Sequence, residues 1–288
     1  MYTFIVNPAA GNGYALKTEA ALRGVMDEKR LPYEFMHTQY PEHATELAHI
    51  AAGRDNTSCV IAVGGDGTAY EVACGLLGSG VPMGIVPAGT GNDFIKTVGI
   101  PKKPLEALEA ILKGTPRPVD VGRLNNRMFL NICGTGFDVQ TLEYTLAAKK
   151  YVRGLLPYMI GLIRAIFSYK PVHVAFIVDG ETQERDVLLC SIANGQYFGG
   201  GIPVCPDARA DDGLLDMVIV ETKPRWKIPF YLPALMMGKI DGFKITTHKR
   251  CSSMIIRSKG MKLNVDGEIL TMDEAEFEIL PGKLLLYW

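Results

Sequence analysis

The sequence lacks an excess of charge of either sign. It carries 30 lysine and arginine residues against 31 aspartate and glutamate residues, so the formal net charge is −1. No overall field therefore draws the chain to nucleic acid or to an anionic surface, and any basic patch must be local. We accordingly expect no nucleic-acid partner.

Cysteine pairs and long uncharged runs are also absent. The six cysteines are scattered without a C-x-x-C pair, which predicts free thiols in a reducing compartment. The most apolar later segment, residues 151–169, is interrupted by Arg153, Pro157 and Arg164. No uncharged stretch within it is therefore long enough to span a bilayer. The first apolar run has no basic region before it, unlike a signal peptide. These features predict a cytoplasmic protein whose membrane association is transient and peripheral.

Apolar runs of strand length alternate with helical patterns through the first third of the chain. The predicted strands YTFIV, YEFMHT, CVIAV and MGIVP are separated by helical patterns over residues 14–29, 43–52 and 69–77. This order is typical of a parallel sheet covered by helices, and CVIAV and MGIVP are apolar throughout, as strands buried on both faces are. We predict an α/β amino-terminal domain.

The pattern changes after Pro101. A helical stretch at 105–113 precedes two predicted strands that pair around an Asn125-Asn126 turn. Later extended runs such as VHVAFIVDG, DVLLCSIAN and LLDMVIVE are broken by helical stretches at 137–149, 155–167 and 227–237. We therefore predict two domains, an α/β domain over residues 1–124 and a mainly antiparallel β domain over 125–288. The last ~10 residues are a candidate strand that returns to the first domain.

The strongest local signal is Gly-Gly-Asp-Gly-Thr, Gly64 to Thr68, which follows a buried strand and opens a helix. Glycines let the backbone approach a phosphate, and the free N–H groups of a helix N-terminus favour an anion. A carboxylate beside phosphates is repelled unless a metal ion or a transferred proton gives it a role, so Asp66 suggests Mg²⁺ binding or acid–base chemistry. The alternative for this loop alone is a tight turn in which Asp66 caps the helix.

Three other strands end in polar loops. Residues 7–13 follow the first strand, Thr38 ends the second, and residues 87–94 follow the fourth. Open α/β sheets bind ligands at the carboxyl edge, where these strand ends should meet. Gly11-x-Gly13 falls short of a dinucleotide fingerprint, and the chain has no G-x-x-x-x-G-K-[ST] motif, which disfavours NAD-type Rossmann and P-loop proteins.

Acidic residues cluster twice in the carboxy-terminal part. Residues 206–216 contain four aspartates before a strand, a pattern that suits either a hard cation or a solvated acidic turn. Residues 264–268, Asn-Val-Asp-Gly-Glu, predict a hairpin with an Asp-Gly turn.

Taken in order, these motifs resemble the diacylglycerol kinase catalytic family, most closely its bacterial soluble lipid kinases, over essentially the whole chain. The family's asparagine-proline loop, G-G-D-G-T, G-T-x-N-D-F, N-x-x-G-x-G-F-D, D-D-G-x-L-D and D-G-E motifs correspond in turn to Asn7-Pro8 with Gly11, Gly64 to Thr68, Gly89 to Phe94, Asn131 to Asp138, Asp211 to Asp216, and Asp266 to Glu268. One departure is Ala10, where the family commonly has serine, which puts a side-chain phosphate contact there in doubt.

The resemblance implies an amino-terminal domain like that of phosphofructokinases and NAD kinases, a β-rich second domain and an ATP site in the cleft between them. It implies a structural Mg²⁺ held by the Asp212 carboxylate and the carbonyl groups of Arg209 and Leu214, and a general base at Glu268. The implied nucleotide-binding residues are Asn7, Thr38, Gly64, Gly65, Asp66, Gly67, Thr68, Thr90, Gly91 and Asn92. Our hypothesis gives Asp66 the catalytic Mg²⁺ or its bound water, and Asp66 as the base is the alternative.

The resemblance predicts an ATP-dependent lipid kinase of phospholipid metabolism and lipid biosynthesis, with diacylglycerol as the leading acceptor and phosphatidic acid as its product. The alternatives are a small-molecule kinase like NAD kinase, and a non-catalytic relative that binds nucleotide or lipid. A homodimer is left open.

A lipid substrate has to be reached at a membrane surface. Lys149, Lys150, Arg153, Arg164 and Lys170 flank the apolar residues 155–167, and this arrangement suits an interfacial helix. The alternative is a helix that packs its apolar stripe on a sheet. The same two readings apply to residues 225–239.

Overall fold

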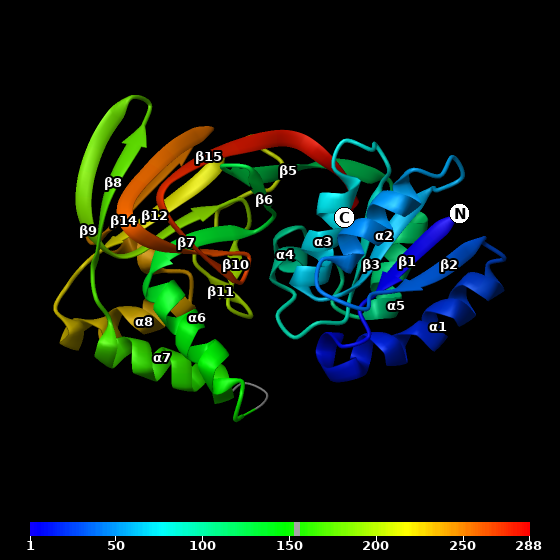
Figure 1. Ribbon diagram of the computed structural model, residues 1–288, viewed down its shortest axis with the longest axis horizontal. Helices are drawn as coiled ribbons and strands as arrows, with labels where there is room; N and C mark the ends of the chain where they lie inside the picture. Colours follow the sequence, from blue (N-terminus) through cyan, green and yellow to red (C-terminus); the bar gives the residue numbers. More distant parts are fainter. Residues whose placement is uncertain (153–155) are drawn as a thin grey trace. The chain divides into compact units, whose positions relative to one another are not determined.

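The computed structural model describes residues 1–152 and 156–288 (Figure 1). Their contacts divide them into two compact units. The first unit comprises Met1–Val121, Arg209–Gly213 and Leu280–Trp288, and the second comprises Gly122–Ala208 and Leu214–Ile279. The predicted fold class is confirmed, because the first unit is α/β and the strands of the second are mainly antiparallel.

The first unit is built on a parallel sheet. Its strands are β1 (Tyr2–Val6), β2 (Tyr33–His37), β3 (Cys59–Gly64) and β4 (Met83–Pro87), in the order β4-β3-β1-β2. Leu286 of β15 (Glu268–Tyr287) pairs with Met83 and adds a further parallel neighbour to β4. Strands β3 and β4 are buried along their whole length, as their continuously apolar sequences predict.

Helices supply the rest of the first core. They are η1 (Ala10–Gly13), α1 (Tyr14–Glu28), α2 (His43–Ala52), α3 (Asp66–Leu76), α4 (Asp93–Thr97) and α5 (Pro104–Lys113). Leu22 and Met26 of α1 and Leu108 of α5 pack with strand residues such as Phe4 and Ile61 in one buried cluster. Removal of this apolar surface from water stabilises the unit and fixes the positions of the loops at the strand ends.

Both predicted hairpins are present, and their turns lie in the second unit. Strand β5 (Pro116–Leu124) pairs antiparallel with β6 (Arg127–Phe129) around Asn125, whose φ is 50°, and β14 (Ser253–Val265) pairs with β15 across the Asp266-Gly267 turn. The remaining strands are β7 (Ile132–Gly136), β8 (Val172–Val178), β9 (Glu181–Ala193), β10 (Tyr197–Phe198), β11 (Ile202–Pro203), β12 (Leu215–Glu221) and β13 (Thr246–Cys251). β9 pairs antiparallel with β7, β8 and β12.

Helices cover one face of the second unit's strands. They are α6 (Phe137–Ala148), α7 (Leu156–Ser168), η2 (Arg225–Lys227), α8 (Ile228–Met236) and η3 (Ile240–Gly242), and they lie near one another in Figure 1. Residues of α6, α7 and α8 share one buried cluster with Leu188 and Leu189 of β9 and Val218 and Val220 of β12. Arg153 and Leu155 of the predicted interfacial segment lie outside the described residues. No helix in the described part of the chain has both the length and the apolar character needed to cross a bilayer.

The cysteine prediction is confirmed for the thiols themselves. All six are free, and five of them are buried while Cys74 is half-buried. Burial raises the pKa of the Cys251 thiol to about 11, which keeps it protonated and unreactive near neutral pH.

Candidate active site

Three loops meet at the carboxyl edge of the first sheet, after β1, β3 and β4. At Gly11, whose φ is +58°, a β-carbon would lie 2.2 Å from the carbonyl oxygen of Ala88. At Gly89 a β-carbon would lie 2.3 Å from the α-carbon of Gly65. Both positions therefore require glycine, and the loops present bare backbone to one another and to their surroundings. Close packing of the loops against one another thus accounts for both glycines, and we call the three loops together the glycine cradle.

Amide side chains fix the shape of this cradle. Asn7 donates from Nδ2 to the Thr68 hydroxyl at 3.2 Å and accepts the Ala9 N–H at 3.1 Å, so it ties the first loop to the start of α3. Asn92 accepts the Gly89 N–H at 3.2 Å and donates back to the Gly89 carbonyl at 2.9 Å. The loop backbones are thus held in place by hydrogen bonds of Asn7, Thr68 and Asn92.

Asp66 is the first residue of α3 rather than part of a loop before it. The sequence placed the helix start at residue 69, and the difference arises because Asp66, Gly67 and Thr68 already form the first helical turn. Its Oδ1 atom accepts the N–H groups of Asp93 at 2.7 Å and of Phe94 at 3.1 Å. The capping role raised as an alternative is therefore real, but the helix that Asp66 caps is α4.

The surroundings of Asp66 are unfavourable for its charge. Burial, and after it the carboxylate of Asp93, raise the pKa of Asp66 above its usual value, while the two backbone N–H groups and Lys96 act in the opposite direction. Asp93 is itself buried and pairs with Lys96 at 2.7 Å. A half-buried carboxylate whose charge is disfavoured suits contact with a cation or service as a proton donor.

The other predicted nucleotide-binding residues of this unit lie at two places. Thr90 and Gly91 lie in the loop between β4 and α4, where Thr90 is exposed. Thr38 follows β2 at the end of the strand order, and its N–H donates to the carbonyl of Val6 at 2.9 Å. Thr38 thus lies two strands away from β3 along the same sheet.

The acidic loop is organised by a residue that the sequence analysis missed. Asp120 accepts the N–H groups of Gly213 at 2.7 Å and Gly282 at 2.8 Å, and its own N–H donates to the carbonyl of Ala210. Contacts consequently group Arg209–Gly213 with the first unit, although the sequence order places it in the carboxy-terminal half. An aspartate among the buried residues of β5 was the available signal, since a buried charge needs partners.

The acidic loop offers hard oxygen ligands but few side chains. Arg209 pairs with Asp211, with 3.1 Å between Nε and Oδ1. In residues 1–152 and 156–288 no three acidic, histidine or cysteine side chains surround a common point. A cation at this loop would therefore depend on main-chain carbonyl groups beside the side chain of Asp212. Leu214, the third expected ligand, falls in the second unit.

Asp216 does not belong to the acidic loop. It lies in β12 with 1% of its side chain exposed, and its Oδ1 is 2.7 Å from Nε2 of His248 on β13. This hydrogen bond raises the pKa of His248. The carboxylate holds the His248 ring by this hydrogen bond within the second unit instead of contributing to a metal-type loop.

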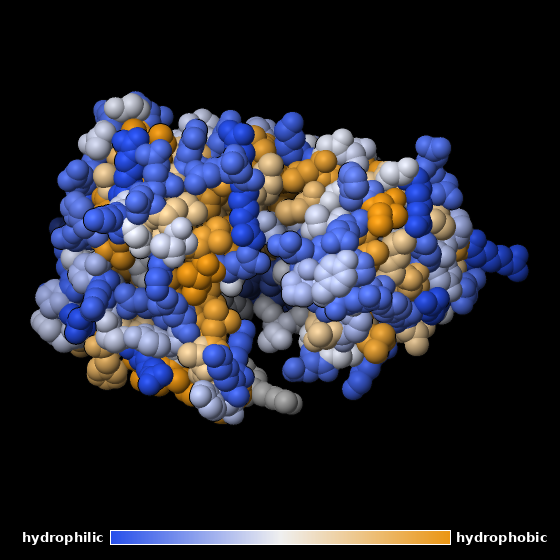
Figure 2. Space-filling model, in the orientation of Figure 1, coloured by the Kyte–Doolittle hydropathy of each residue, from blue (hydrophilic) through white to orange (hydrophobic). Residues whose placement is uncertain are grey.

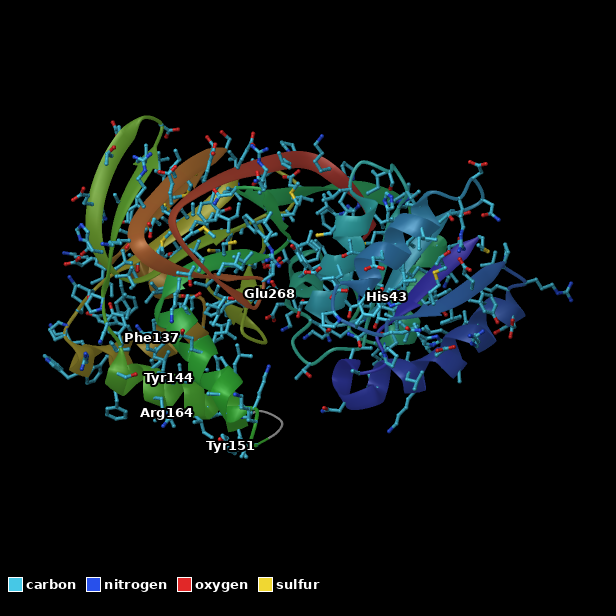
Figure 3. All side chains as sticks on the ribbon, in the orientation of Figure 1. His43, Phe137, Tyr144, Tyr151, Arg164 and Glu268 are labelled. Carbon is cyan, nitrogen blue, oxygen red and sulfur yellow. The ribbon has the colours of Figure 1, made fainter. Side chains whose placement is uncertain are left out.

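The Asp-Gly-Glu turn carries two carboxylates with separate tasks. Asp266 accepts the N–H groups of Leu130 at 2.7 Å, Asn131 at 3.1 Å and Ile132 at 3.0 Å, so it anchors the chain entering β7. Glu268, labelled in Figure 3, forms an ion pair with Arg127 and leaves 59% of its side chain exposed. Glu268 is therefore accessible to a substrate, whereas Asp266 is structural. Arg127 was missed because its partner lies 141 residues away.

A further carboxylate of the second unit is buried without a full set of partners. Asp138 is the second residue of α6, and burial raises its pKa to about 7. Its Oδ2 is 3.4 Å from Nδ2 of Asn264, while Oδ1 has no hydrogen-bond partner within the described residues. A β-carbon at Gly134 would lie 2.4 Å from Oδ2, which explains the glycine beneath it.

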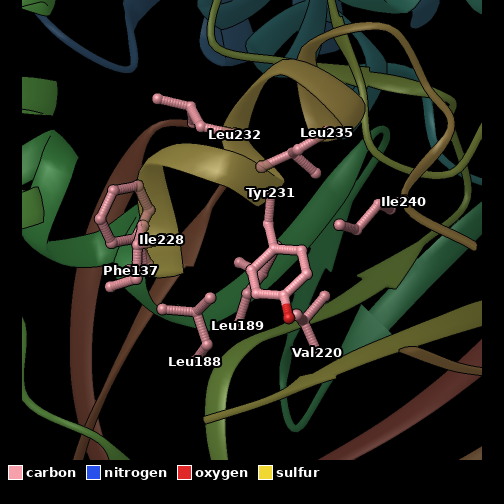
Figure 4. Close-up of a pocket in the computed structure, with 9 residues that line it drawn as sticks. All are labelled: Phe137, Leu188, Leu189, Val220, Ile228, Tyr231, Leu232, Leu235 and Ile240. Carbon is pink, nitrogen blue, oxygen red and sulfur yellow. The ribbon is translucent and has the colours of Figure 1, made fainter. Parts of the chain in front are cut away.

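An apolar pocket lies between α8 and the strands beneath it (Figure 4). Leu188, Leu189 and Val220 of the strands form one wall, and Ile228, Tyr231, Leu232 and Leu235 of α8 form the other, with Phe137 and Ile240 at its ends. The described residues that line the pocket include no charged side chain, and Tyr231 brings a hydroxyl group, so the pocket suits mainly apolar atoms.

Comparison with known proteins finds a family match for each of the two parts of the chain. Residues 1–124 match the diacylglycerol kinase catalytic domain, and residues 131–288 match the YegS carboxy-terminal domain, which is described as NAD kinase β-sandwich-like. The departure at Ala10 therefore occurs in a chain whose two domains both match the family.

Individual relatives agree with this assignment. The chain is 27% identical over 292 residues to a diacylglycerol kinase of Mycobacterium tuberculosis, with 98% of this chain and 93% of the relative covered. It is 30% identical over 278 residues to a diacylglycerol kinase of Bacillus subtilis, with 95% and 91% covered. A YegS-like lipid kinase of Pseudomonas aeruginosa is 35% identical over 244 residues, with 79% and 76% covered.

A solved structure shows the same architecture over the full length. The crystal structure of a Bacillus anthracis protein assigned to the diacylglycerol kinases superposes with a TM-score of 0.84 at 29% identity, covering 100% of this chain and 94% of that chain. The domain matches, the relatives and the fold agree, and the chain belongs to the diacylglycerol kinase family of bacterial lipid kinases.

Proposed function

We propose that the chain is an ATP-dependent lipid kinase that transfers the γ-phosphoryl group to the hydroxyl of diacylglycerol and forms phosphatidic acid. The observation that carries the proposal is the cradle in which Gly11, Gly65 and Gly89 bring three loops into backbone contact beside Asp66. Names of relatives support the acceptor, because those from Mycobacterium tuberculosis and Bacillus subtilis are called diacylglycerol kinases.

Phosphoryl transfer requires alignment and charge neutralisation more than covalent chemistry. In the proposed complex, N–H groups of the Gly64–Thr68 segment and of the Thr90–Asn92 loop bind the phosphates, with Asn7 keeping the loops in register. Thr38 lies farther along the sheet edge, toward the nucleoside. These residues position the donor, and the glycines allow its phosphates to approach the backbone.

The residues present fit Mg²⁺ at two places. Asp66 offers a carboxylate oxygen beside the cradle, and Asp212 with the carbonyl groups of Arg209 and Leu214 would hold a structural ion. Bound Mg²⁺ would neutralise negative charge on the phosphate oxygens. The protein's own part is to keep these carboxylates oriented, which the N–H groups of α4 do for Asp66 and Asp120 does for the acidic loop.

The assay that tests the proposal supplies γ-labelled ATP and Mg²⁺ with separate acceptors. We expect label in phosphatidic acid when diacylglycerol is present, and little transfer to ceramide, sphingosine or NAD. Labelled NADP without labelled lipid would favour the NAD kinase-like alternative. Absence of any labelled product, with ATP binding retained, would favour a non-catalytic relative and overturn the proposal.

Replacement of Glu268 tests the proposed general base. We expect Glu268→Gln to lower kcat by roughly 10²-fold, at the lower end of the range for acid–base catalysis because the side chain is largely exposed. The measurement is the initial rate at saturating ATP and diacylglycerol.

A matched control is present on the same strand. Glu274 of β15 pairs with Arg257, and about half of each side chain is exposed, so Glu274→Gln removes an equivalent ion pair away from the turn. We expect Glu274→Gln to keep the wild-type rate. Equal rates for both variants would remove Glu268 from the mechanism.

A further inference from the structure

Helix α7 is apolar on two opposite faces. Pro157, Gly161, Leu162 and Ala165 are buried against the unit. Leu156, Met159, Ile163 and Phe167 follow one another at intervals of three, four and four residues, which places them along one stripe on the opposite side. They are exposed, Ile163 by 51% and Phe167 by 76%. A helix that is apolar all round normally has a second apolar partner.

Helix α8 repeats this arrangement without a single charged residue. Its inner face, including Tyr231 and Leu235, lines the apolar pocket of Figure 4. Its outer face carries Phe230, which is 72% exposed, and Met236, and Trp226 immediately before the helix is 68% exposed. Both helices therefore expose large apolar side chains that no other described part of the chain buries.

The two helices cover the same face of the second unit. Leu162 and Ala165 of α7 lie in one buried cluster with Ile228 of α8, and Leu232 and Leu235 pack against it. Because the inner faces of both helices meet this single cluster, their outer faces point away from the same side of the sheet. Figure 2 shows hydrophobic side chains on the surface over these helices.

Charge in this region departs sharply from the balance of the whole chain. Residues 149–170 contain five lysine or arginine residues and no acidic residue, and residues 223–244 contain five against Asp241 alone. The chain as a whole has a net charge of −1. Arg164, labelled in Figure 3, lies over the ring of Tyr144 at 5.6 Å, and Nζ of Lys227 lies 5.1 Å from the ring of Trp226. Basic groups thus border the exposed apolar side chains.

We infer that the outer faces of α7 and α8 form a docking surface for a bilayer that contains anionic phospholipid. We name it the α7–α8 surface and define it by Leu156, Met159, Ile163, Phe167, Trp226, Phe230, Met236 and Met237. The inference rests on the proposed function, because a lipid kinase must reach an acceptor held in a membrane. Apolar side chains enter the boundary between headgroups and acyl chains, and the surrounding lysines and arginines meet the anionic headgroups.

A second copy of the chain fits this surface less well than a bilayer. A twofold interface brings the same patch of each copy together, so two strongly basic rims would face each other without acidic partners. An anionic bilayer supplies the opposite charge over the whole surface. Trp226 also suits a membrane interface, where its apolar ring and its polar N–H edge are both satisfied.

The test is sedimentation with vesicles in the absence of ATP. Two vesicle types are used, pure phosphatidylcholine and a mixture with phosphatidylglycerol. We expect the wild-type chain to bind the anionic vesicles, and to bind them less at high salt because surface charges are screened. The variant Ile163→Gln/Phe167→Gln/Trp226→Gln/Phe230→Gln should bind at least about tenfold more weakly, since each change removes an apolar side chain from the interface.

A matched control changes exposed apolar side chains outside the α7–α8 surface. Ile50 and Leu105 of the first unit are 52% and 42% exposed, and Ile50→Gln/Leu105→Gln should bind vesicles like the wild type. Circular dichroism should be unchanged in both variants, because all six side chains point to solvent.

Activity separates the docking inference from the proposed function. With short-chain diacylglycerol dispersed in detergent, the four-residue variant should match the wild-type rate, and it should lose activity only on vesicles. Equal vesicle binding by variant and wild type would overturn the docking surface and leave the kinase proposal intact.

A wild-type dimer that the four changes dissociate, with vesicle binding unaffected, would assign the surface to a second copy. Weakened binding without lipid phosphorylation by any form would instead overturn the kinase proposal.

Discussion

Asp66→Asn should lower kcat by about 10²–10⁴-fold while the protein stays folded. Asparagine has the same shape, and its side-chain oxygen can still accept the N–H groups of Asp93 and Phe94, now held by Oδ1 at 2.7 and 3.1 Å. The substitution therefore removes the negative charge but keeps the cap of α4. A carboxylate that serves only as this cap would tolerate the change, whereas one that binds a cation or moves a proton would not.

The measurement combines initial rates with thermal unfolding. Asp55→Asn is the matched control, because Asp55 is an exposed aspartate in the same unit. We expect the Asp66 variant to unfold within a few degrees of the wild type and to retain ATP binding at higher Mg²⁺. A rate within threefold of the wild type would reduce Asp66 to a structural residue and would leave Glu268 as the remaining candidate for acid–base chemistry.

The Asp66 geometry also shows what a sequence can and cannot reveal. Strands β3 and β4 were predictable because each is apolar throughout, and the glycine loops follow directly from those strand ends. The partner of Asp66 was not predictable, since capping of a helix 27 residues away depends on how two loops cross. Local patterns thus located the cradle but not its hydrogen bonds.

Long-range anchors were missed for the same reason. Asp120 binds the backbone of Gly213 and Gly282, which are 93 and 162 residues away, and Asp266 binds three N–H groups more than 130 residues away. Backbone N–H groups are present at nearly every residue, so no pattern of side chains identifies the ones that a carboxylate will meet. A carboxylate that the fold removes from water needs such hydrogen bonds, and the sequence does not show which carboxylates the fold will bury.

Helix α7 marks a different limit. Its sequence predicts a helix correctly, because apolar residues occur at helical spacing and few residues break the pattern. Which of its two apolar faces is buried cannot be read from a helix that is apolar all round. The packing of Leu162 and Ala165 in the unit's core answers that question, and it leaves Phe167 on the outside. Tyr158 also packs against this core.

Asp138→Asn should remove a fall in stability that the wild-type protein shows between about pH 4 and pH 7. Burial raises the pKa of Asp138 to about 7, whereas the unfolded chain has an ordinary aspartate pKa of about 3.9. Across that window the folded state holds a proton that the unfolded state has lost, so unfolding becomes easier as pH rises. The stabilisation is complete below the unfolded pKa and is lost as pH rises through the folded pKa.

The expected size follows from the same values. Stability should fall by up to about 1.4 kcal/mol for each pH unit in the window, or about 4 kcal/mol in all. Asparagine cannot ionise, so the variant should show a nearly flat profile in urea unfolding at pH 5, 6, 7 and 8. Glu181→Gln, at an exposed carboxylate in the same unit, should retain the wild-type slope. If the Asp138 variant kept the wild-type slope, another group of the second unit whose pKa is raised, such as His248, would have to bind the proton, and Asp138 would be ionised in the folded protein despite its burial.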